Sequence, residues 1–231
     1  MIAVIVAAAG QGRRLGSGGP KALRLLAGLP LYEYTLDTLQ RVPHVGGVWL
    51  VVPDAAREEV ATALRRRGKF ALPIHVVPGG EERQDSVNNA VASLPQEVSL
   101  VVVHDAARPF ASAKLFESCI AAAQLRGAAI AAIPARDTVK LVEGGVVTGT
   151  VDRNRTWLAQ TPQAARADWL RHALREAALA KRQFTDEAGA LEQCGYQVYV
   201  VQGEEWNRKL TTPEDWDWAE WYVAHKRATS A

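Results

Sequence analysis

Short apolar segments alternate with amphipathic segments along the first half of the chain. The apolar segments are residues 2–9, 47–53, 74–78, 98–105 and 128–134, with a sixth at 196–203. Segments with a helical spacing of apolar positions lie between them, at residues 30–42, 54–68, 83–94 and 112–127. Short runs that are uniformly apolar are typical of parallel strands covered by helices on both faces. The alternation therefore predicts an α/β fold with a doubly wound, mostly parallel sheet and right-handed crossovers.

The pattern changes after residue 136. Residues 137–153 alternate apolar and polar positions around Gly144 and Gly145, which is typical of a two-stranded hairpin. We expect residues 134–155 to form an arm inserted into the α/β core. Helical patterning returns at residues 165–182, 185–195 and 211–227. Because no linker rich in Pro, Gly or Ser divides the chain, residues 1–231 are expected to form a single domain.

The composition narrows the classes of function. The 231 residues include 27 Lys and Arg against 25 Asp and Glu, a net charge of +2 that gives no electrostatic case for nucleic-acid binding. Cys119 and Cys194 lie far apart, which indicates neither a disulfide framework nor a zinc site and favours the cytoplasm. The apolar start lacks the basic residues of a secretory signal, and no apolar run reaches the roughly 20 residues of a membrane span. We expect a cytoplasmic protein without a membrane anchor.

The loop after the first predicted strand is rich in glycine and in cationic side chains. Residues 6–28 read VAAAGQGRRLGSGGPKALRLLAG. Glycine allows the backbone to approach a ligand closely, and Arg14 and Lys21 bring positive charge, so the loop favours an anionic ligand. Neither the P-loop pattern nor the dinucleotide fingerprint is met, because Ala22 follows Lys21 and the glycine spacing is too wide. The alternative is a flexible connection with solvated arginines.

Two further stretches follow predicted strands. In HDAARP (104–109), Asp105 lies where a carboxylate can hold Mg²⁺ together with substrate phosphates, although a helix N-cap is an equal alternative. His104 is interpreted as a packed or hydrogen-bonding histidine rather than a catalyst. In GGEERQDSV (79–87), the start of a helix with Ser86 in its first turn could bind a carbonyl or amide edge, and ordinary capping is the alternative.

Taken in order, the motifs resemble one enzyme family. They are GQGRR…GPK, GGEERQDSV, HDAARP, RDTVK, VDRN, TPQ, TDEA and NRKLTTPED. Nearly the whole chain resembles the 2-C-methyl-D-erythritol 4-phosphate cytidylyltransferases of the non-mevalonate isoprenoid pathway. The resemblance implies a Rossmann-like nucleotidyltransferase fold and transfer of CMP from CTP to methylerythritol 4-phosphate, with release of pyrophosphate. It also implies a requirement for Mg²⁺, with Mn²⁺ as a substitute.

The resemblance assigns roles residue by residue. It places Arg14 and Lys21 at the transition state around the triphosphate, Arg153 and Lys209 at the attacking acceptor phosphate, and Asp105 at the metal. Positions around the cytosine and ribose are Ala8, Ala9, Gly10, Gly80, Glu81, Ser86 and Ala106. Positions around the acceptor are Arg108, Thr138 and Thr161. Two positions depart from the family pattern: Glu81 stands where a shorter aspartate is common, and Arg208 where a small apolar residue is common.

The arm has a particular meaning in this family. It is exchanged across a homodimer and completes the site of the neighbouring subunit, which would bring Thr138 and Arg153 to a partner's pocket. Among rival functions, a ribitol 5-phosphate cytidylyltransferase would share the fold and the chemistry. A nucleotidyltransferase for another base, a non-catalytic nucleotide-binding protein and a dehydrogenase fit the motifs less well. The tryptophans near the C-terminus are interpreted as core or dimer packing.

Overall fold

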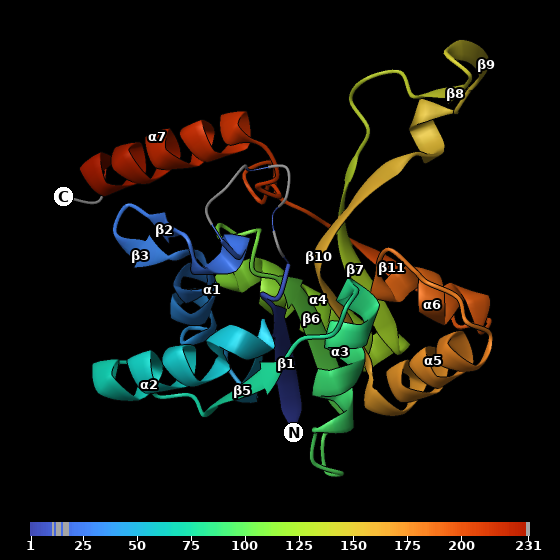
Figure 1. The fold of residues 1–231 in the computed structure, drawn as a ribbon. Helices are drawn as coiled ribbons and strands as arrows, with labels where there is room; N and C mark the ends of the chain where they lie inside the picture. Colours follow the sequence, from blue (N-terminus) through green and yellow to red (C-terminus); the bar gives the residue numbers. More distant parts are fainter. Residues whose placement is uncertain (11, 13–14, 16–18, 230–231) are drawn as a thin grey trace.

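The computed structural model describes residues 1–229 apart from residues 11, 13–14 and 16–18 (Figure 1). The strands are β1 (Ile2–Ala7), β2 (Leu25–Leu26), β3 (Leu29–Pro30), β4 (Val45–Val52), β5 (Ile74–Pro78), β6 (Leu100–Asp105), β7 (Ala128–Pro134), β8 (Lys140–Glu143), β9 (Val146–Thr150), β10 (Trp157–Arg166) and β11 (Tyr199–Gln202). The α-helices are α1 (Leu31–Leu39), α2 (Arg57–Arg67), α3 (Arg83–Ala92), α4 (Ala113–Arg126), α5 (Ala167–Leu179), α6 (Glu187–Gln193) and α7 (Pro213–Thr229). Short 3-10 turns are η2 (Lys21–Leu23), η3 (Asp54–Ala56) and η4 (Arg153–Arg155).

The central sheet has the strand order β11-β7-β10-β6-β1-β4-β5. Strand β1 pairs in parallel with β4 and β6, β4 with β5, and β7 with β11. Strand β10 is antiparallel to both of its neighbours, β6 and β7. The predicted doubly wound, mostly parallel sheet is confirmed, and each of the six apolar segments contains one of its strands. The sequence did not predict β10. Residues 165–166, expected as the start of the helix at 165–182, belong to this strand instead.

Alternate residues of the central strands pack on opposite faces of the sheet. Val4 and Val6 of β1 join a core with residues of α1, α2 and α4, whereas Ala3 and Ile5 join a second core with α3, α5 and α6. Burial on both faces explains why β1 is apolar at every position. In the described part of the chain, no helix has both the length and the apolar character needed to cross a bilayer.

A third, smaller core holds the loop before α7. Leu210 is fully buried with Leu26 and Leu31, and Ala219 and Val223 of α7 complete the cluster. Figure 1 shows α7 lying above β2 and β3 at the carboxyl end of the sheet. The buried Leu210 anchors the loop, and the adjacent residue 209 is thereby held at the sheet edge.

The tryptophans of this region divide between packing and exposure. Trp216 and Trp218 are partly buried against the third core, whereas Trp206 and Trp221 are each 55% exposed. The core interpretation is therefore confirmed for the first two.

The predicted hairpin is confirmed as the β8–β9 pair. Gly144 and Gly145 have φ values of 55° and 81°, the left-handed conformations that a tight two-residue hairpin turn requires. Figure 1 shows the hairpin projecting away from the sheet beyond β7 and β10. Its apolar side chains are more than half exposed; these are Leu141, Val142, Val146 and Val147.

Candidate active site

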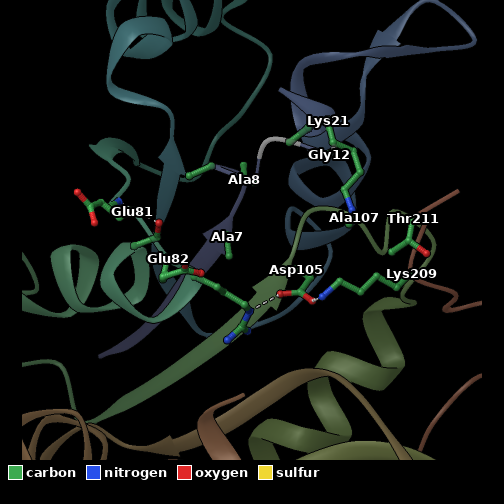
Figure 2. A pocket seen from close by; sticks show the side chains of 16 residues that line it. Ala7, Ala8, Gly12, Lys21, Glu81, Glu82, Asp105, Ala107, Lys209 and Thr211 are labelled. Atoms are coloured by element: carbon green, nitrogen blue, oxygen red, sulfur yellow. Dashed lines mark hydrogen bonds and ion pairs between the residues drawn. The ribbon is translucent and has the colours of Figure 1, made fainter. Parts of the chain in front are cut away.

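A pocket of about 420 Å³ lies at the carboxyl edge of the sheet (Figure 2). It is formed by the end of β1, the start of α3, the end of β6 and the loop before α7. The lining residues are Ala7, Ala8, Ala9, Gly10, Gly12, Lys21, Ala22, Gly80, Glu81, Glu82, Arg83, Ser86, Asp105, Ala107, Lys209 and Thr211. Ligands of open α/β sheets bind at this edge, so the pocket is where the fold itself favours a substrate.

The glycine-rich loop brings Lys21 to the pocket. Gly12 has a φ of 65°, and a Cβ at this position would lie 2.7 Å from the Cβ of Lys21, so only glycine fits there. The Lys21 amide donates a hydrogen bond to the Gly10 carbonyl at 3.3 Å, and its ammonium donates to the Leu210 carbonyl at 2.8 Å. Lys21 is therefore held between two walls of the pocket. The predicted Arg14 lies outside the described residues.

The start of α3 packs closely against the end of β1. A Cβ on Gly79 would lie 2.5 Å from the Cβ of Ala9, and a Cβ on Gly80 would lie 2.3 Å from that of Asp85. The Gly80 amide donates to the Ser86 hydroxyl at 3.0 Å, so Ser86 fixes this turn, whereas Glu82 and Asp85 form the capping box of the helix. Of the residues predicted around the cytosine and ribose, all but one line the pocket: Ala8, Ala9, Gly10, Gly80, Glu81 and Ser86.

The exception is Ala106. Its side chain is fully buried, and its amide donates to the Ala7 carbonyl at 3.0 Å. Its neighbour Ala107 lines the pocket instead.

Asp105 lies at the centre of a buried charge cluster. Its Oδ1 accepts from Arg83 Nε at 2.9 Å, and its Oδ2 pairs with Lys209 Nζ at 2.7 Å. Figure 2 shows Asp105 and Lys209 pointing toward each other from opposite sides of the pocket. Burial alone would raise the pKa of Asp105, but the two cations outweigh it and hold this pKa well below its usual range. The carboxylate is therefore ionised at neutral pH.

A chain of hydrogen bonds fixes the backbone of Asp105. Its amide donates to the Thr161 hydroxyl at 3.0 Å, and that hydroxyl lies 3.1 Å from His104 Nδ1. His104 Nε2 lies 3.0 Å from the Arg108 carbonyl, an obligate acceptor, so Nε2 carries the proton and Nδ1 accepts from Thr161. Burial lowers the pKa of His104 to about 4. The interpretation of His104 as a packed, hydrogen-bonding residue agrees with this neutral state.

Several predicted acceptor residues lie outside this pocket. The Arg108 guanidinium donates to the backbone carbonyls of Asn207 at 2.8 Å and Ala159 at 3.2 Å. Thr161 is buried behind Asp105. Thr138 and Arg153 are exposed on the arm segment, where Arg153 donates to the Arg136 carbonyl at 3.1 Å. One subunit thus brings together the predicted nucleotide and metal residues with Lys209, but not the arm residues.

The departure at Arg208 leaves Lys209 in place. The Arg208 guanidinium lies over the ring of Trp218, 4.9 Å from its centroid, so it is directed onto α7. Lys209 is then free to reach Asp105 from the same loop.

Two residues of the charge cluster were not predicted from the sequence. Arg83 contacts Asp105, and both of its terminal nitrogens donate to Glu187, at 2.7 and 3.0 Å. Both residues lie in quoted motifs, GGEERQDSV and TDEA, but their pairing spans 104 positions of the sequence. The only signal was that each is a charged residue at the start of a helix, a place where charge is common in any protein.

A family model for 2-C-methyl-D-erythritol 4-phosphate cytidylyltransferase matches residues 2–225. The chain belongs to this family. The resemblance found in the sequence is therefore confirmed, and the chain is a cytidylyltransferase. The matched range includes the residues that line the pocket and those of the arm.

Similar proteins agree with the cytidylyltransferase assignment. A 2-C-methyl-D-erythritol 4-phosphate cytidylyltransferase of Syntrophus aciditrophicus is 40% identical over 93% of this chain and 92% of its own. A bifunctional enzyme IspD/IspF of Desulfotalea psychrophila is 42% identical over 97% of this chain, which spans 57% of the length of that relative. The crystal structure of 4-diphosphocytidyl-2C-methyl-D-erythritol synthase from Anaerococcus prevotii is 30% identical, with a TM-score of 0.85 over 97% of this chain and 98% of that one.

Proposed function

We propose that this chain transfers CMP from CTP to 2-C-methyl-D-erythritol 4-phosphate, forming 4-diphosphocytidyl-2-C-methyl-D-erythritol and pyrophosphate. Family membership supports the activity. The observation that best supports this function is that Lys21, Asp105 and Lys209 lie in one pocket. They lie beside the tightly packed turn at Gly79 and Gly80. That turn offers backbone groups to a base, and the cations face the place where a triphosphate would lie.

The reaction requires alignment of the two substrates and neutralisation of the charge on their phosphates. An oxygen of the acceptor phosphate attacks the α-phosphorus of CTP, the bond from this phosphorus to the bridging oxygen breaks, and pyrophosphate leaves with the electron pair. Lys21 now donates to a backbone carbonyl, and we infer that a phosphate oxygen replaces this acceptor when CTP binds. Only the family pattern assigns Arg14 to the charge of the triphosphate. No covalent intermediate with the enzyme is needed.

Lys209 is proposed to position the attacking phosphate. Its side chain is 40% exposed, whereas its partner Asp105 is 8% exposed, so Lys209 is the member of the pair that is able to move. An incoming acceptor phosphate offers it a second anionic partner at the pocket mouth. Arg108 is proposed to act on the acceptor from its place beside Asn207, and Thr161 by holding Asp105.

The residues present fit Mg²⁺ when a triphosphate binds with it. Among the described residues, no group of three or more His, Cys, Asp and Glu side chains could hold a metal ion. Asp105 supplies one carboxylate, and Mg²⁺ commonly takes one or two carboxylates together with substrate phosphates and water. We therefore propose that Asp105 holds Mg²⁺ once Lys209 has moved from its Oδ2. The bound metal would neutralise charge that develops on the phosphates.

We also propose that the arm completes the acceptor site of a second subunit in a homodimer. Thr138 and Arg153 are assigned to the acceptor, yet within one subunit neither lines the pocket. The hairpin beside them exposes four apolar side chains, which a partner subunit would cover. A cytoplasmic location belongs to the same proposal, because CTP is an intracellular nucleotide and both cysteines are free thiols.

The test is pyrophosphate release from CTP and Mg²⁺ with methylerythritol 4-phosphate or ribitol 5-phosphate as the acceptor. Strong preference for methylerythritol 4-phosphate is the expected result. Preference for ribitol 5-phosphate would retain the chemistry and contradict the proposed acceptor. Release with neither acceptor would contradict the proposed activity, and omission of each acceptor controls for hydrolysis of CTP.

A further inference from the structure

Arg83 lines the pocket, but two carboxylates already neutralise its positive charge. Its side chain is 24% exposed, and it pairs with Asp105, 8% exposed, and Glu187, 5% exposed. Glu187 takes both terminal nitrogens of the guanidinium, in the two-pronged geometry of strong arginine–carboxylate pairs. Burial would lower the pKa of Arg83, but Glu187 and Asp105 outweigh it and raise this pKa. A guanidinium so occupied offers little to a phosphate.

The remaining nitrogen of Arg83 has a different use. Nε donates to Oδ1 of Asp105 at 2.9 Å, on the side of the carboxylate away from Lys209. With the Asp105 amide bonded to Thr161, the backbone and one carboxylate oxygen are both fixed. Oδ2, which pairs with the more exposed Lys209, is then the oxygen presented to the pocket.

Hydrogen bonds other than those to Arg83 hold the segment around Glu187 in place. The Gln84 side chain donates to the Arg182 carbonyl at 3.0 Å and accepts from the Phe184 amide at 2.9 Å. The Gln163 side chain donates to Asp186 and accepts from the Ala188 amide, each at 3.0 Å. The TDEA motif (185–188) is thus tied to α3 and to β10. Glu187 itself does not line the pocket, but it contacts Arg83, which does.

We propose that Arg83 is the positioning residue for Asp105, and that the TDEA segment contributes to the reaction by holding Arg83 through Glu187. The inference rests on the proposed function, since it gives Asp105 a task in binding the metal–nucleotide complex. Replacing such a supporting partner typically weakens metal affinity or activity about 10- to 100-fold.

The experiment measures Mn²⁺ binding in the presence of CTP, from the electron paramagnetic resonance signal of free Mn²⁺. In the double variant Arg83→Met/Glu187→Leu, both charges are replaced by apolar groups of similar size, so no buried charge is left unpaired. We expect its Mn²⁺ affinity to fall at least about 10-fold, with kcat falling in parallel. The control is Asp168→Asn, which disrupts the comparable but exposed pair between Arg166 and Asp168, and it should stay within about 2-fold of the unsubstituted chain.

The single variants test the order of action. Glu187→Leu alone should weaken binding, yet in the Arg83→Met background it should add less than about 2-fold, because Glu187 acts through Arg83. An equal loss in both backgrounds would overturn the role given to the TDEA segment. If a single variant does not fold, unchanged Mn²⁺ binding by the double variant would still overturn the proposal.

Different results would contradict the proposed function and the positioning role of Arg83. An unsubstituted chain that binds Mn²⁺ with CTP but releases no pyrophosphate would contradict the activity, while a loss of binding in the double variant would still support the positioning role. Normal turnover and normal Mn²⁺ affinity in the double variant would overturn that role and leave the activity standing.

Discussion

The pocket and the arm differ in how their polar side chains are surrounded. In the pocket, Asp105 is 8% exposed and every charge of its cluster is paired within the same subunit. On the arm, Arg153 and Thr138 are exposed, and the apolar residues beside them are more than half exposed. The difference indicates that the pocket is organised within one subunit, whereas the role proposed for the arm requires a second one.

The largest effect is expected at the pocket, from Lys21→Ala. The variant loses a cation aimed at the triphosphate, and loss of one such group costs about 10²- to 10³-fold in kcat. Folding should be retained because this lysine is only partly buried and begins a short 3-10 turn. Pyrophosphate release measures the effect, with the exposed Lys114→Ala as the control. Near-normal turnover would remove Lys21 from the mechanism.

The second prediction concerns the buried network behind Asp105. His104 is neutral in the fold with a pKa of about 4, against about 6.5 when unfolded, so the unfolded state binds more protons between these values. Stability should therefore decrease as pH falls through this window, by about 3 kcal/mol at pH 4. Urea unfolding at several pH values measures the loss.

His104→Gln supplies the matched comparison for that prediction. Glutamine retains one donor and one acceptor but does not titrate, so this contribution to the pH dependence should disappear. The exposed His225→Gln should leave it unchanged. An identical pH dependence in His104→Gln and the unsubstituted chain would contradict the neutral, buried network.

The arm gives a smaller effect, confined to one substrate. Arg153→Ala should raise KM for the acceptor about 10- to 100-fold, the value of a lost charge-assisted hydrogen bond, and leave KM for CTP unchanged. Steady-state kinetics with each substrate varied in turn measure both constants. An equal change in both would contradict the separation of the two regions.

Mixing two defective variants tests whether the arm serves its own subunit. In a heterodimer of Lys21→Ala and Arg153→Ala, arm exchange leaves one site with an intact Lys21 and an intact Arg153. Random exchange of subunits should then restore about a quarter of full activity. If each arm served its own pocket, both sites would remain defective and no activity would return.

The smallest effect is expected on the stability of the single subunit. Val147 is 58% exposed, so Val147→Ser should change its unfolding free energy by less than about 0.5 kcal/mol. The fully buried Val102 provides the contrast, since Val102→Ala should cost roughly 2 kcal/mol. Size-exclusion chromatography should show weaker association of Val147→Ser. A large loss of single-subunit stability would contradict the view of the hairpin as uncovered.

The sequence predicted the regular parts of this fold well. Six strands were visible as continuous apolar runs, which burial on both faces demands of the inner strands β1, β4 and β6, and Gly144 with Gly145 identified the hairpin turn. Strand β10 was missed because its centre is polar: Gln160, Thr161 and Gln163 are buried, and their polar groups are satisfied by specific partners. A proline at 162 also argues against a central strand in any pattern-based reading.

The residues of the pocket that could be predicted are those that follow a predicted strand or that the family resemblance assigns. Lys21 and Asp105 follow predicted strands, Lys209 was assigned by the resemblance, and the three meet in one pocket. Arg83 and Glu187 were not found, since only the folded chain brings α3 and α6 together. Thr138 and Arg153 lie outside the pocket of their own subunit, a position that the hairpin pattern alone could not predict and that only the family resemblance implied.

The position of the arm between β7 and β10 has a further consequence. These strands are adjacent and antiparallel, and Pro134 pairs directly with Trp157, so the segment leaves and re-enters the sheet at neighbouring points. Residues inserted or removed between these points stretch no other connection of the chain. The arm can therefore change in length and sequence without displacing the strands that carry the pocket.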